Sequence, residues 1–222
     1  MVELGRAAVD AASDPETWVP IAAAAAIAIA GVDEDWSEDL AEDQPIFGSD
    51  AADLSTDLQN IATAAYFVTA LAAPSATFGD KAKGLGVGIS TFVLDGVINQ
   101  GLKDLTKRER PDGSNDQSMP SGHASKAASR TALAINNLDY IEMPGWSRSL
   151  AAWSLRSVAI GSGLARVEAE KHHLSDVLVG YAMGHFIAGF MQRAFLEQRS
   201  AAAISFVSVP EGGALRLSVP LN

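Results

Sequence analysis

The sequence predicts an all-α protein, a six-helix bundle that carries a small C-terminal β-hairpin. Apolar segments with helical spacing are separated by Gly, Pro and charged residues, and they cover residues 17–30, 55–73, 83–105, 122–137, 147–166 and 175–197. The end of the chain differs, because ISFVSVPEGGALRLSVPLN alternates apolar and polar residues on both sides of a Gly-containing turn. An isolated hairpin is barely stable in water, so we expect it to pack on the bundle or on another chain.

The length and composition favour one domain. The chain has 222 residues, 48% of them hydrophobic, which is enough for one sizeable core. We divide residues 1–222 into an acidic N-terminal segment with the first helix (1–57), a catalytic helical core (58–197) and the hairpin (203–222). The acidic stretch 33–53 contains Pro and is expected to hold a short surface helix. Cysteine is absent, which excludes disulfides and thiolate metal sites and fits any compartment.

The net charge of −11 is distributed unevenly along the chain. Residues 1–80 are strongly acidic with Arg6 as their one base, whereas residues 81–222 carry a small excess of bases. A nucleic-acid-binding protein is expected to be basic with a continuous positive stripe, and this sequence has neither. The local basic cluster Lys103, Lys107, Arg108 and Arg110 suits a small anionic ligand instead.

The sequence favours a soluble or peripheral protein over an integral membrane protein. The first ten residues show no secretory signal, although one removed before residue 1 would leave this same sequence. Residues 60–79 carry no charge and reach the ~20 residues that a span needs, but they are rich in Ala and Thr and contain Pro74. Lys126, Arg130 and Arg156 lie within predicted helices, where facing lipid would be costly.

Three polar clusters interrupt the predicted helices: KDLTKRERP, PSGH and ARVEAEKHHLSD. Short connections favour antiparallel neighbours in a helical bundle. The third predicted helix therefore ends where the fourth begins, and the fifth ends there as well. We expect all three clusters to meet at one end of the bundle.

These clusters contain the groups that phosphoryl transfer needs. Lys103, Arg110 and Arg166 are cations suited to a tetrahedral oxyanion, which guanidinium groups hold through paired hydrogen bonds. His123 and His172 titrate near neutrality. Beside a bound phosphoryl group, one histidine can attack phosphorus while the other protonates the leaving oxygen.

Further polar groups lie close to these residues in the sequence. Asp176 follows His172 by four residues and is expected to lie within hydrogen-bond reach of it, fixing the tautomer of the ring. The backbone N–H groups of Ser121 and Gly122, at a helix N-terminus, offer donors to an anion. Such a reaction needs no metal, and we expect none.

Together the motifs resemble a known three-part signature. Lys103, six residues and Arg110-Pro111 form the first part, and Pro120-Ser121-Gly122-His123 the second; the third is Arg166, five residues, His172, three residues and Asp176. This arrangement is similar to the signature of the type 2 phosphatidic acid phosphatase superfamily, which also includes bacterial nonspecific acid phosphatases and vanadium haloperoxidases. One position departs: Ala165 stands where the third motif usually has Ser, which removes one hydroxyl.

The resemblance implies a role for each matching residue. His172 would be the nucleophile that becomes phosphohistidine, with Asp176 as its orienting partner, and His123 would be the general acid and later the base. The phosphoryl oxygens would be held by five residues: Lys103, Arg110, Ser121, Gly122 and Arg166.

The resemblance also implies the function. We expect a metal-independent phosphatase that hydrolyses phosphomonoesters or pyrophosphates, above all lipid phosphates, in a bacterial periplasm or cell envelope, without a cofactor. Vanadate could bind as a phosphate mimic, so a vanadate-dependent haloperoxidase is the first alternative, although the chain is short for one. An inactive phosphate- or lipid-binding module is the other alternative. The partner is a phosphorylated small molecule or lipid rather than nucleic acid, and a peripheral membrane contact and a homo-oligomer remain compatible with the sequence.

Several residues near the motifs match no motif position. His173 is expected to lie at the surface or behind the site, and Lys107, Arg108 and Lys171 to contribute positive field rather than direct contacts. Asp95, alone in a predicted helix, is expected to make a hydrogen bond within the bundle.

Overall fold

The computed structural model describes residues 2–43, 45–196, 203–209 and 212–218. Its helices are α1 (Val2–Ala12), α2 (Pro15–Ala30), α3 (Asp33–Glu38), α4 (Ala51–Ala72), α5 (Phe78–Thr106), α6 (Gly122–Leu138), α7 (Gly145–Glu168) and α8 (Leu174–Phe195). A π-helical turn, η1 (Asp39–Asp43), continues α3, and a 3₁₀ turn, η2 (Gly48–Asp50), precedes α4.

The prediction of an all-α fold is confirmed, but the number of helices was wrong. Each of the six predicted segments overlaps one long helix, and the described residues hold eight α-helices. The short α3 lies in the acidic stretch, and α1 was not expected at all. Ala7 and Ala11 are the buried residues of α1, which packs on α8. Such small side chains give only a weak hydrophobic pattern in the sequence.

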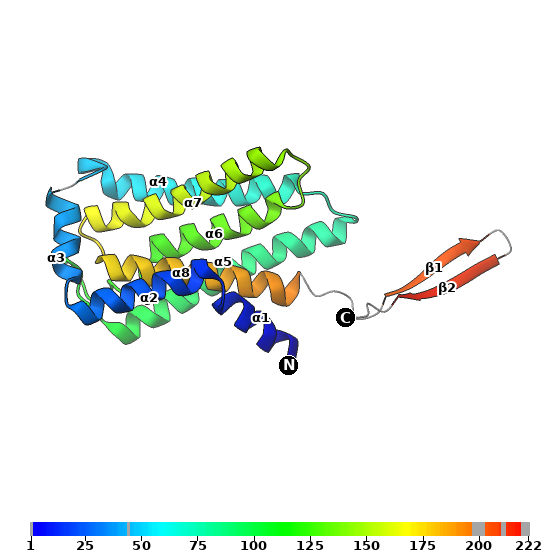
Figure 1. Cartoon of the computed structure of the whole chain (residues 1–222), viewed down its shortest axis with the longest axis horizontal. Helices are drawn as coiled ribbons and strands as arrows, with labels where there is room; N and C mark the ends of the chain where they lie inside the picture. The colour runs from blue at the N-terminus through cyan, green and yellow to red at the C-terminus, as the bar shows by residue number, and fades with distance from the viewer. Residues whose placement is uncertain (1, 44, 197–202, 210–211, 219–222) are drawn as a thin grey trace.

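Helix α6 lies inside a bundle formed by α4, α5, α7 and α8, and it packs on all four (Figure 1). Small side chains allow this close packing. A Cβ at Gly180 of α8 would lie 2.4 Å from the carbonyl oxygen of Ser121, and one at Gly184 would lie 2.1 Å from that of Ser125. Glycines four residues apart therefore let the backbones of α6 and α8 approach closely, as in other Gly-xxx-Gly helix pairs.

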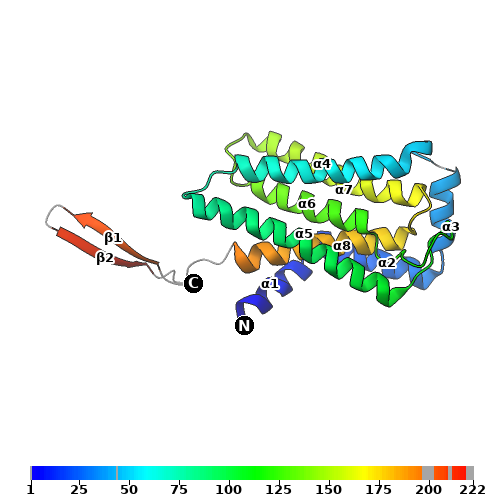
Figure 2. The same cartoon turned by 180° about the vertical axis from the view of Figure 1, so that it is seen from behind.

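Capping residues fix the start of α5 and both ends of α2. Thr77 and Asp80 form a capping box at the start of α5, in which each side chain accepts a hydrogen bond from the other residue's backbone. Asp14 caps α2, which ends at Gly31 in a left-handed conformation with φ of 70°. The sharp turn after Gly31 sends α3 across the end of the bundle (Figures 1 and 2).

Two acidic side chains hold this N-terminal segment against the bundle. Asp33 of α3 accepts hydrogen bonds from Ser175 of α8. Glu168, at the end of α7, accepts hydrogen bonds from the backbone N–H groups of three consecutive residues, Ile46, Phe47 and Gly48. The segment between α2 and α4 is thus tied to the end of the bundle at two points.

Asp95 lies in the interior of the bundle, where its carboxylate accepts hydrogen bonds from Ser125 and Ser129 of α6. Only 1% of its surface is exposed. The expected hydrogen bond within the bundle is therefore present.

The C-terminal residues form two strands, β1 (Ala203–Val209) and β2 (Gly212–Ser218), which pair antiparallel with Val209 opposite Gly212. We expected these strands to pack on the bundle or on another chain. The side chains that would make such contacts lie outside the part of the chain that the structure describes.

Two helices are long and apolar enough to cross a membrane, α5 and α8, and the bent pair of α2 with residues 33–42 would be a third. In α5, 22% of the most apolar window is buried, and large apolar side chains such as Val93 and Val97 are more than half exposed. Figure 2 shows α5 at the front of the bundle, with no other helix covering it. An exposed apolar helix of this length is typical of a surface that faces lipid.

Candidate active site

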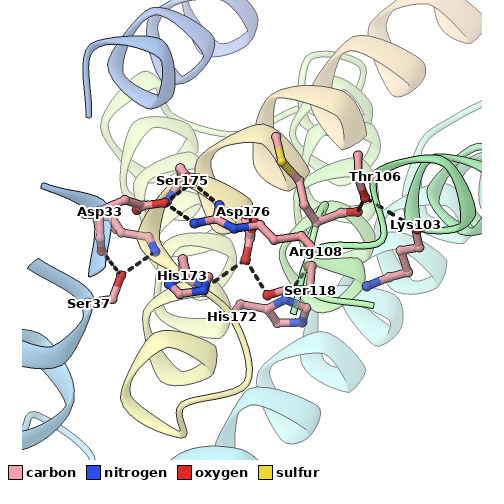
Figure 3. Close-up of polar contacts among 12 residues, drawn as sticks. Asp33, Ser37, Lys103, Thr106, Arg108, Ser118, His172, His173, Ser175 and Asp176 are labelled. Carbon is pink, nitrogen blue, oxygen red and sulfur yellow. Dashed lines mark hydrogen bonds and ion pairs between the residues drawn. The ribbon is translucent and has the colours of Figure 1, made fainter. Parts of the chain in front are cut away.

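The five predicted cations and histidines lie at one end of the bundle, each on a different segment. Lys103 is in the last turn of α5, Arg110 in the connection from α5 to α6, His123 in the first turn of α6, Arg166 in the last turn of α7, and His172 in the connection from α7 to α8. Figure 3 shows Lys103 and His172 with the polar residues around them. The antiparallel order of the helices brings these sequence-distant groups together, as the sequence analysis expected.

The three cations form a largely buried positive cluster. Lys103 and Arg166 are each 8% exposed, and Lys103 donates a hydrogen bond to the carbonyl of Gln117. The Nε atoms of Arg110 and Arg166 are buried and have no hydrogen-bond partner among the described residues. Leaving such donors unpaired costs about 1–3 kcal/mol each or more. A bound oxyanion would supply the missing acceptors.

His172 is 2% exposed, and its orientation is set by a backbone carbonyl. Its Nδ1 lies 2.6 Å from the carbonyl oxygen of Ser118. A carbonyl only accepts hydrogen bonds, so Nδ1 carries the proton and Nε2 keeps its lone pair. Burial, followed by the charges of Lys103 and Arg110, lowers the pKa of His172 well below its usual value. The imidazole is therefore neutral at pH 7 and has a free nucleophilic nitrogen.

The expected direct hydrogen bond between Asp176 and His172 does not occur in the described part of the chain. The Asp176 carboxylate, which is fully buried, accepts hydrogen bonds from the backbone N–H of His173 at 2.9 Å and from the Ser118 hydroxyl at 2.5 Å (Figure 3). Asp176 occupies the third position of α8, so its side chain turns back to cap the helix. It acts on His172 through Ser118, whose hydroxyl it binds and whose carbonyl orients the ring.

Arg108 makes direct contacts that the sequence analysis did not expect. Its guanidinium forms ion pairs with Asp176 at 2.9 Å and with Asp33 at 2.7 Å, and it donates to the Ser175 hydroxyl at 2.7 Å. The expectation that Arg108 contributes only field was therefore wrong. The carboxylate of Asp176 is fully buried and needs a partner, but that partner is supplied by a residue 68 positions earlier in the chain. No local pattern marks such a pair.

His123 is half-buried, with Nε2 3.4 Å from the Thr56 hydroxyl of α4. Burial, and then the charges of Arg166 and Lys126, lower the pKa of His123 to about 4. In the unliganded protein this ring is neutral at pH 7. A negative ligand held by the same cations would raise its pKa and favour the protonated form.

The start of α6 supplies further groups, though not all those expected. The backbone N–H of Ser121 donates to the carbonyl of Asp176 at 2.9 Å, so it is not available to an anion. The buried Ser121 hydroxyl and the Nδ2 of Asn99 both lack a partner among the described residues. Gly122 allows close packing here, since a Cβ at this position would lie 3.2 Å from Oδ1 of Asn99. Asn99, one turn before Lys103, is a site residue that the sequence analysis missed.

Among the described residues, no group of three or more His, Asp or Glu side chains is arranged to hold a metal ion. The expectation of a metal-independent reaction remains a prediction. The positive cluster itself provides the charge that would bind a phosphoryl group.

Parts of this chain are similar in sequence to known proteins. The family model described as PAP2 superfamily matches residues 84–200. A lipid A 1-phosphatase from Porphyromonas gingivalis is 35% identical over 92 residues, which are 41% of this chain and 19% of that protein. The chain thus spans about a fifth of the length of this curated relative.

A solved structure has the same fold. The crystal structure of the first transmembrane PAP2 type phosphatidylglycerolphosphate phosphatase from Bacillus subtilis superposes with a TM-score of 0.58 and covers 83% of this chain and 96% of its own. The two sequences are 19% identical.

The expectation of a soluble or peripheral protein was wrong. The similar structure is that of a transmembrane phosphatase, and α5, α8 and the bent pair of α2 with residues 33–42 are long and apolar enough to span a membrane. Two of the three charges that argued against a membrane protein, Arg130 and Arg156, contact side chains of other helices. Arg156 binds Glu16 through two nitrogens, at 2.7 and 2.9 Å, and Arg130 stacks on Phe92 at 4.6 Å. These findings point to an integral membrane protein.

Proposed function

The chain belongs to the PAP2 superfamily, and on that premise we propose that it is a phosphatase that hydrolyses phosphorylated lipids through a phosphohistidine intermediate. The observation that carries the proposal is the state of His172. Its Nδ1 is bound to the Ser118 carbonyl, its ring is neutral, and the unpaired nitrogens of Arg110 and Arg166 lie nearby. This arrangement offers an attacking nitrogen beside an anion site.

The proposed reaction has two steps. Nε2 of His172 attacks phosphorus, the bond from phosphorus to the leaving oxygen breaks, and His123 gives its proton to that oxygen. Water then attacks the phosphohistidine while His123 takes up the proton of the water. The bond between phosphorus and Nε2 breaks, inorganic phosphate is released, and both histidines return to their starting states.

Electrostatics favours the transition state in both steps. Lys103, Arg110 and Arg166 neutralise the phosphoryl oxygens, and the Ser121 hydroxyl and Asn99 amide can donate to them. Burial, and then the positive cluster, lower the pKa of His172 and keep it neutral before substrate binds. The bound phosphoryl group raises the pKa of His123, so that His123 holds the proton it must donate.

Two observations support a lipid as the substrate. The apolar, exposed faces of helices such as α5 would keep the site at a membrane surface. The relatives are, by their names, a lipid A phosphatase and a phosphatidylglycerolphosphate phosphatase. We therefore infer a phosphorylated lipid, bound with its head group at the end of the bundle crossed by α3.

The test is release of inorganic phosphate from phosphatidic acid in detergent micelles and from p-nitrophenyl phosphate, each with and without EDTA. We expect activity that survives EDTA and falls by at least ~10³-fold in His172→Ala, because removing a nucleophile leaves only binding effects. His185→Gln, a change at a histidine of α8 outside the positive cluster, serves as the matched control and should retain activity. No release by the unchanged protein from either substrate would overturn the proposal.

The role of His123 as the general acid can be tested by comparing two substrates. His123→Ala should lose more activity on phosphatidic acid than on p-nitrophenyl phosphate, since p-nitrophenolate leaves without a proton and an alkoxide does not. Denatured protein from a short reaction with ³²P-labelled substrate should carry an acid-labile label on His172. Bromide oxidation after addition of vanadate, with no phosphate release, would favour the haloperoxidase alternative.

A further inference from the structure

Helix α5 turns a row of polar side chains into the bundle and its apolar side chains outward. Thr91, Asp95, Asn99 and Lys103 are spaced four residues apart and are all buried, whereas Val93 is 62% exposed. Polar groups are costly inside a membrane-spanning bundle, and ionisable ones usually mark a functional site. Asn99 and Lys103 belong to the candidate active site. Asp95, one helical turn before Asn99, has no part in the proposed reaction.

A matching row of hydroxyl groups runs along α6 from its N-cap residue, Ser121. Ser121, Ser125 and Ser129 are also spaced four residues apart, and all three are completely buried. The hydroxyls of Ser125 and Ser129 donate hydrogen bonds to the two carboxylate oxygens of Asp95, the second at 3.2 Å. In the described part of the chain, these two hydrogen bonds join side chains of α5 to side chains of α6. The two rows are thus linked at Asp95.

Helix α5 depends on such polar contacts for its position along α6. Only 22% of its most apolar window is buried, and no other helix covers its outer face (Figure 2). In lipid, apolar contacts favour no single position strongly, because lipid tails are as apolar as the side chains that they would replace. Hydrogen bonds are directional and specify one register. Asp95 binds two hydroxyls that lie one turn apart, so it holds α5 at one height on α6.

We propose that Asp95 is a positioning residue, which fixes the register of α5 on α6 and thereby places Lys103 and Asn99 at the phosphate site. Asp95 lies one turn from Asn99 and two turns from Lys103, about 6 and 12 Å along the helix axis. A shift of α5 at Asp95 would therefore carry both groups away from the start of α6. The proposal deepens the proposed function and rests on it, because it requires the positive cluster to bind a phosphoryl group.

Electrostatics alone predicts the opposite effect of removing Asp95. A carboxylate near the positive cluster opposes the binding of an anion, so its loss would leave the affinity for sulfate unchanged or increase it. Loss of the register would weaken sulfate binding, because the groups on α5 would no longer converge with Arg110 and Arg166. A weaker affinity therefore reports a change in geometry.

The experiment measures sulfate binding to the whole protein in detergent by calorimetry. Asp95→Leu removes both hydrogen bonds, and an apolar replacement of a buried charged group is often neutral for stability. The freed serine hydroxyls can bond to carbonyls one turn earlier in α6. We expect the Kd for sulfate to rise about five- to tenfold, as partial displacement of one charged donor would give. Asp95→Asn keeps the shape and an acceptor, and should restore the Kd to within about twofold.

Two comparisons separate this role from a general loss of structure. Asp104→Asn removes a negative charge from an exposed position of α5 next to Lys103 and should not weaken sulfate binding. In a Lys103→Gln background, Asp95→Leu should have a much smaller effect, because little is left for Asp95 to position. A loosened bundle would instead show the full effect in both backgrounds.

The outcomes decide between the two proposals. An unchanged or lower Kd in Asp95→Leu would overturn the positioning role and leave the phosphatase proposal intact. The same fold-change in both backgrounds would also overturn it. If Asp95→Leu does not fold, Ser129→Ala, which removes the 3.2 Å hydrogen bond alone, should raise the Kd about two- to threefold, and an unchanged Kd there would refute the role. If the unchanged protein binds no sulfate, the phosphate site fails, and the positioning role fails with it.

Discussion

At the scale of single residues, the orientation of His172 depends on a chain of contacts through the bundle end. The Ser118 carbonyl holds the ring, Asp176 holds the Ser118 hydroxyl, and Arg108 links Asp176 to Asp33 of α3. Figure 3 shows these side chains lying side by side. A change at Arg108 should therefore act on His172, the proposed nucleophile, which Arg108 does not touch.

This chain of contacts yields a first prediction. Arg108→Gln leaves the buried Asp176 carboxylate without its ion pair, so Asp176 and Ser118 should shift. Small displacements of reacting groups cost up to about 100-fold in rate. We expect kcat to fall by about 10- to 100-fold with a much smaller change in KM, because the phosphate-binding cations remain. Lys107→Gln, the exposed neighbour, is the control, and an unchanged kcat in Arg108→Gln would refute the positioning role.

The low pKa of His123 yields a second prediction. The pKa of His123 in the unliganded protein is lowered to about 4, and a bound dianion raises it. Binding near pH 6 should therefore take up protons from solution. Sulfate is a suitable probe because it does not titrate in this range. The measurement is calorimetry in buffers of different ionisation enthalpy.

We expect a net proton uptake on sulfate binding, reduced in His123→Gln. Uptake that is the same in both proteins would assign the proton to another group. Release of protons would contradict the direction of the shift itself.

At the scale of helices, the site depends on how closely α6 and α8 approach. His123 lies in the first turn of α6, and Asp176 lies in the first turn of α8. The carbonyls of Ser121 and Ser125 pack against Gly180 and Gly184. The glycine pair therefore sets the distance between the segments that carry His123 and Asp176.

A third prediction tests this contact. Gly184→Ala places a methyl group 2.1 Å from the carbonyl of Ser125, an overlap that the backbone can relieve only by moving. We expect the free energy of unfolding in detergent to fall by about 1–3 kcal/mol, the usual cost of overpacking. Gly86→Ala in α5, where nothing lies within 4 Å, should be neutral or slightly stabilising. Equal effects of the two changes on thermal unfolding would contradict the contact.

At the scale of the whole molecule, the exposed apolar surface determines where the protein resides. Val93, near the middle of α5, is 62% exposed, and Val97 is 65% exposed on the same helix. In water such a surface would promote aggregation, whereas in a bilayer it faces lipid. The charged end of the bundle, with α3 and the candidate site, then lies at the membrane boundary.

The fourth prediction follows from that surface. Val93→Arg places a charge at the centre of a candidate span, where it costs about 2.5–3.5 kcal/mol on insertion scales. We expect the fraction of protein that resists alkaline carbonate extraction to fall, whereas Val93→Leu should leave it unchanged. A carbonate-resistant fraction that does not respond to Val93→Arg would mean that this face of α5 does not contact lipid.

Much of this molecule follows from local sequence patterns. Helical periodicity and Gly or Pro punctuation located the six long helices, because each helix depends on residues close in sequence. Motif spacing identified Lys103, Arg110, His123, Arg166 and His172, and the antiparallel order of neighbouring helices placed them at one end of the bundle. The sequence itself thus determined where the long helices lie along the chain and which chemical groups the site contains.

Other properties were decided only by the tertiary structure. Arg108 binds Asp33 and Asp176, which are 75 and 68 positions away from it in the sequence. The Ser118 carbonyl binds His172, which is 54 positions away. The membrane-facing surface was likewise misjudged, because Arg130 and Arg156 find their partners on other helices. Side-chain pairing over such separations depends on which helix faces pack together. The sequence alone therefore determined which residues could react, and packing determined what holds them and which surface is left to meet lipid.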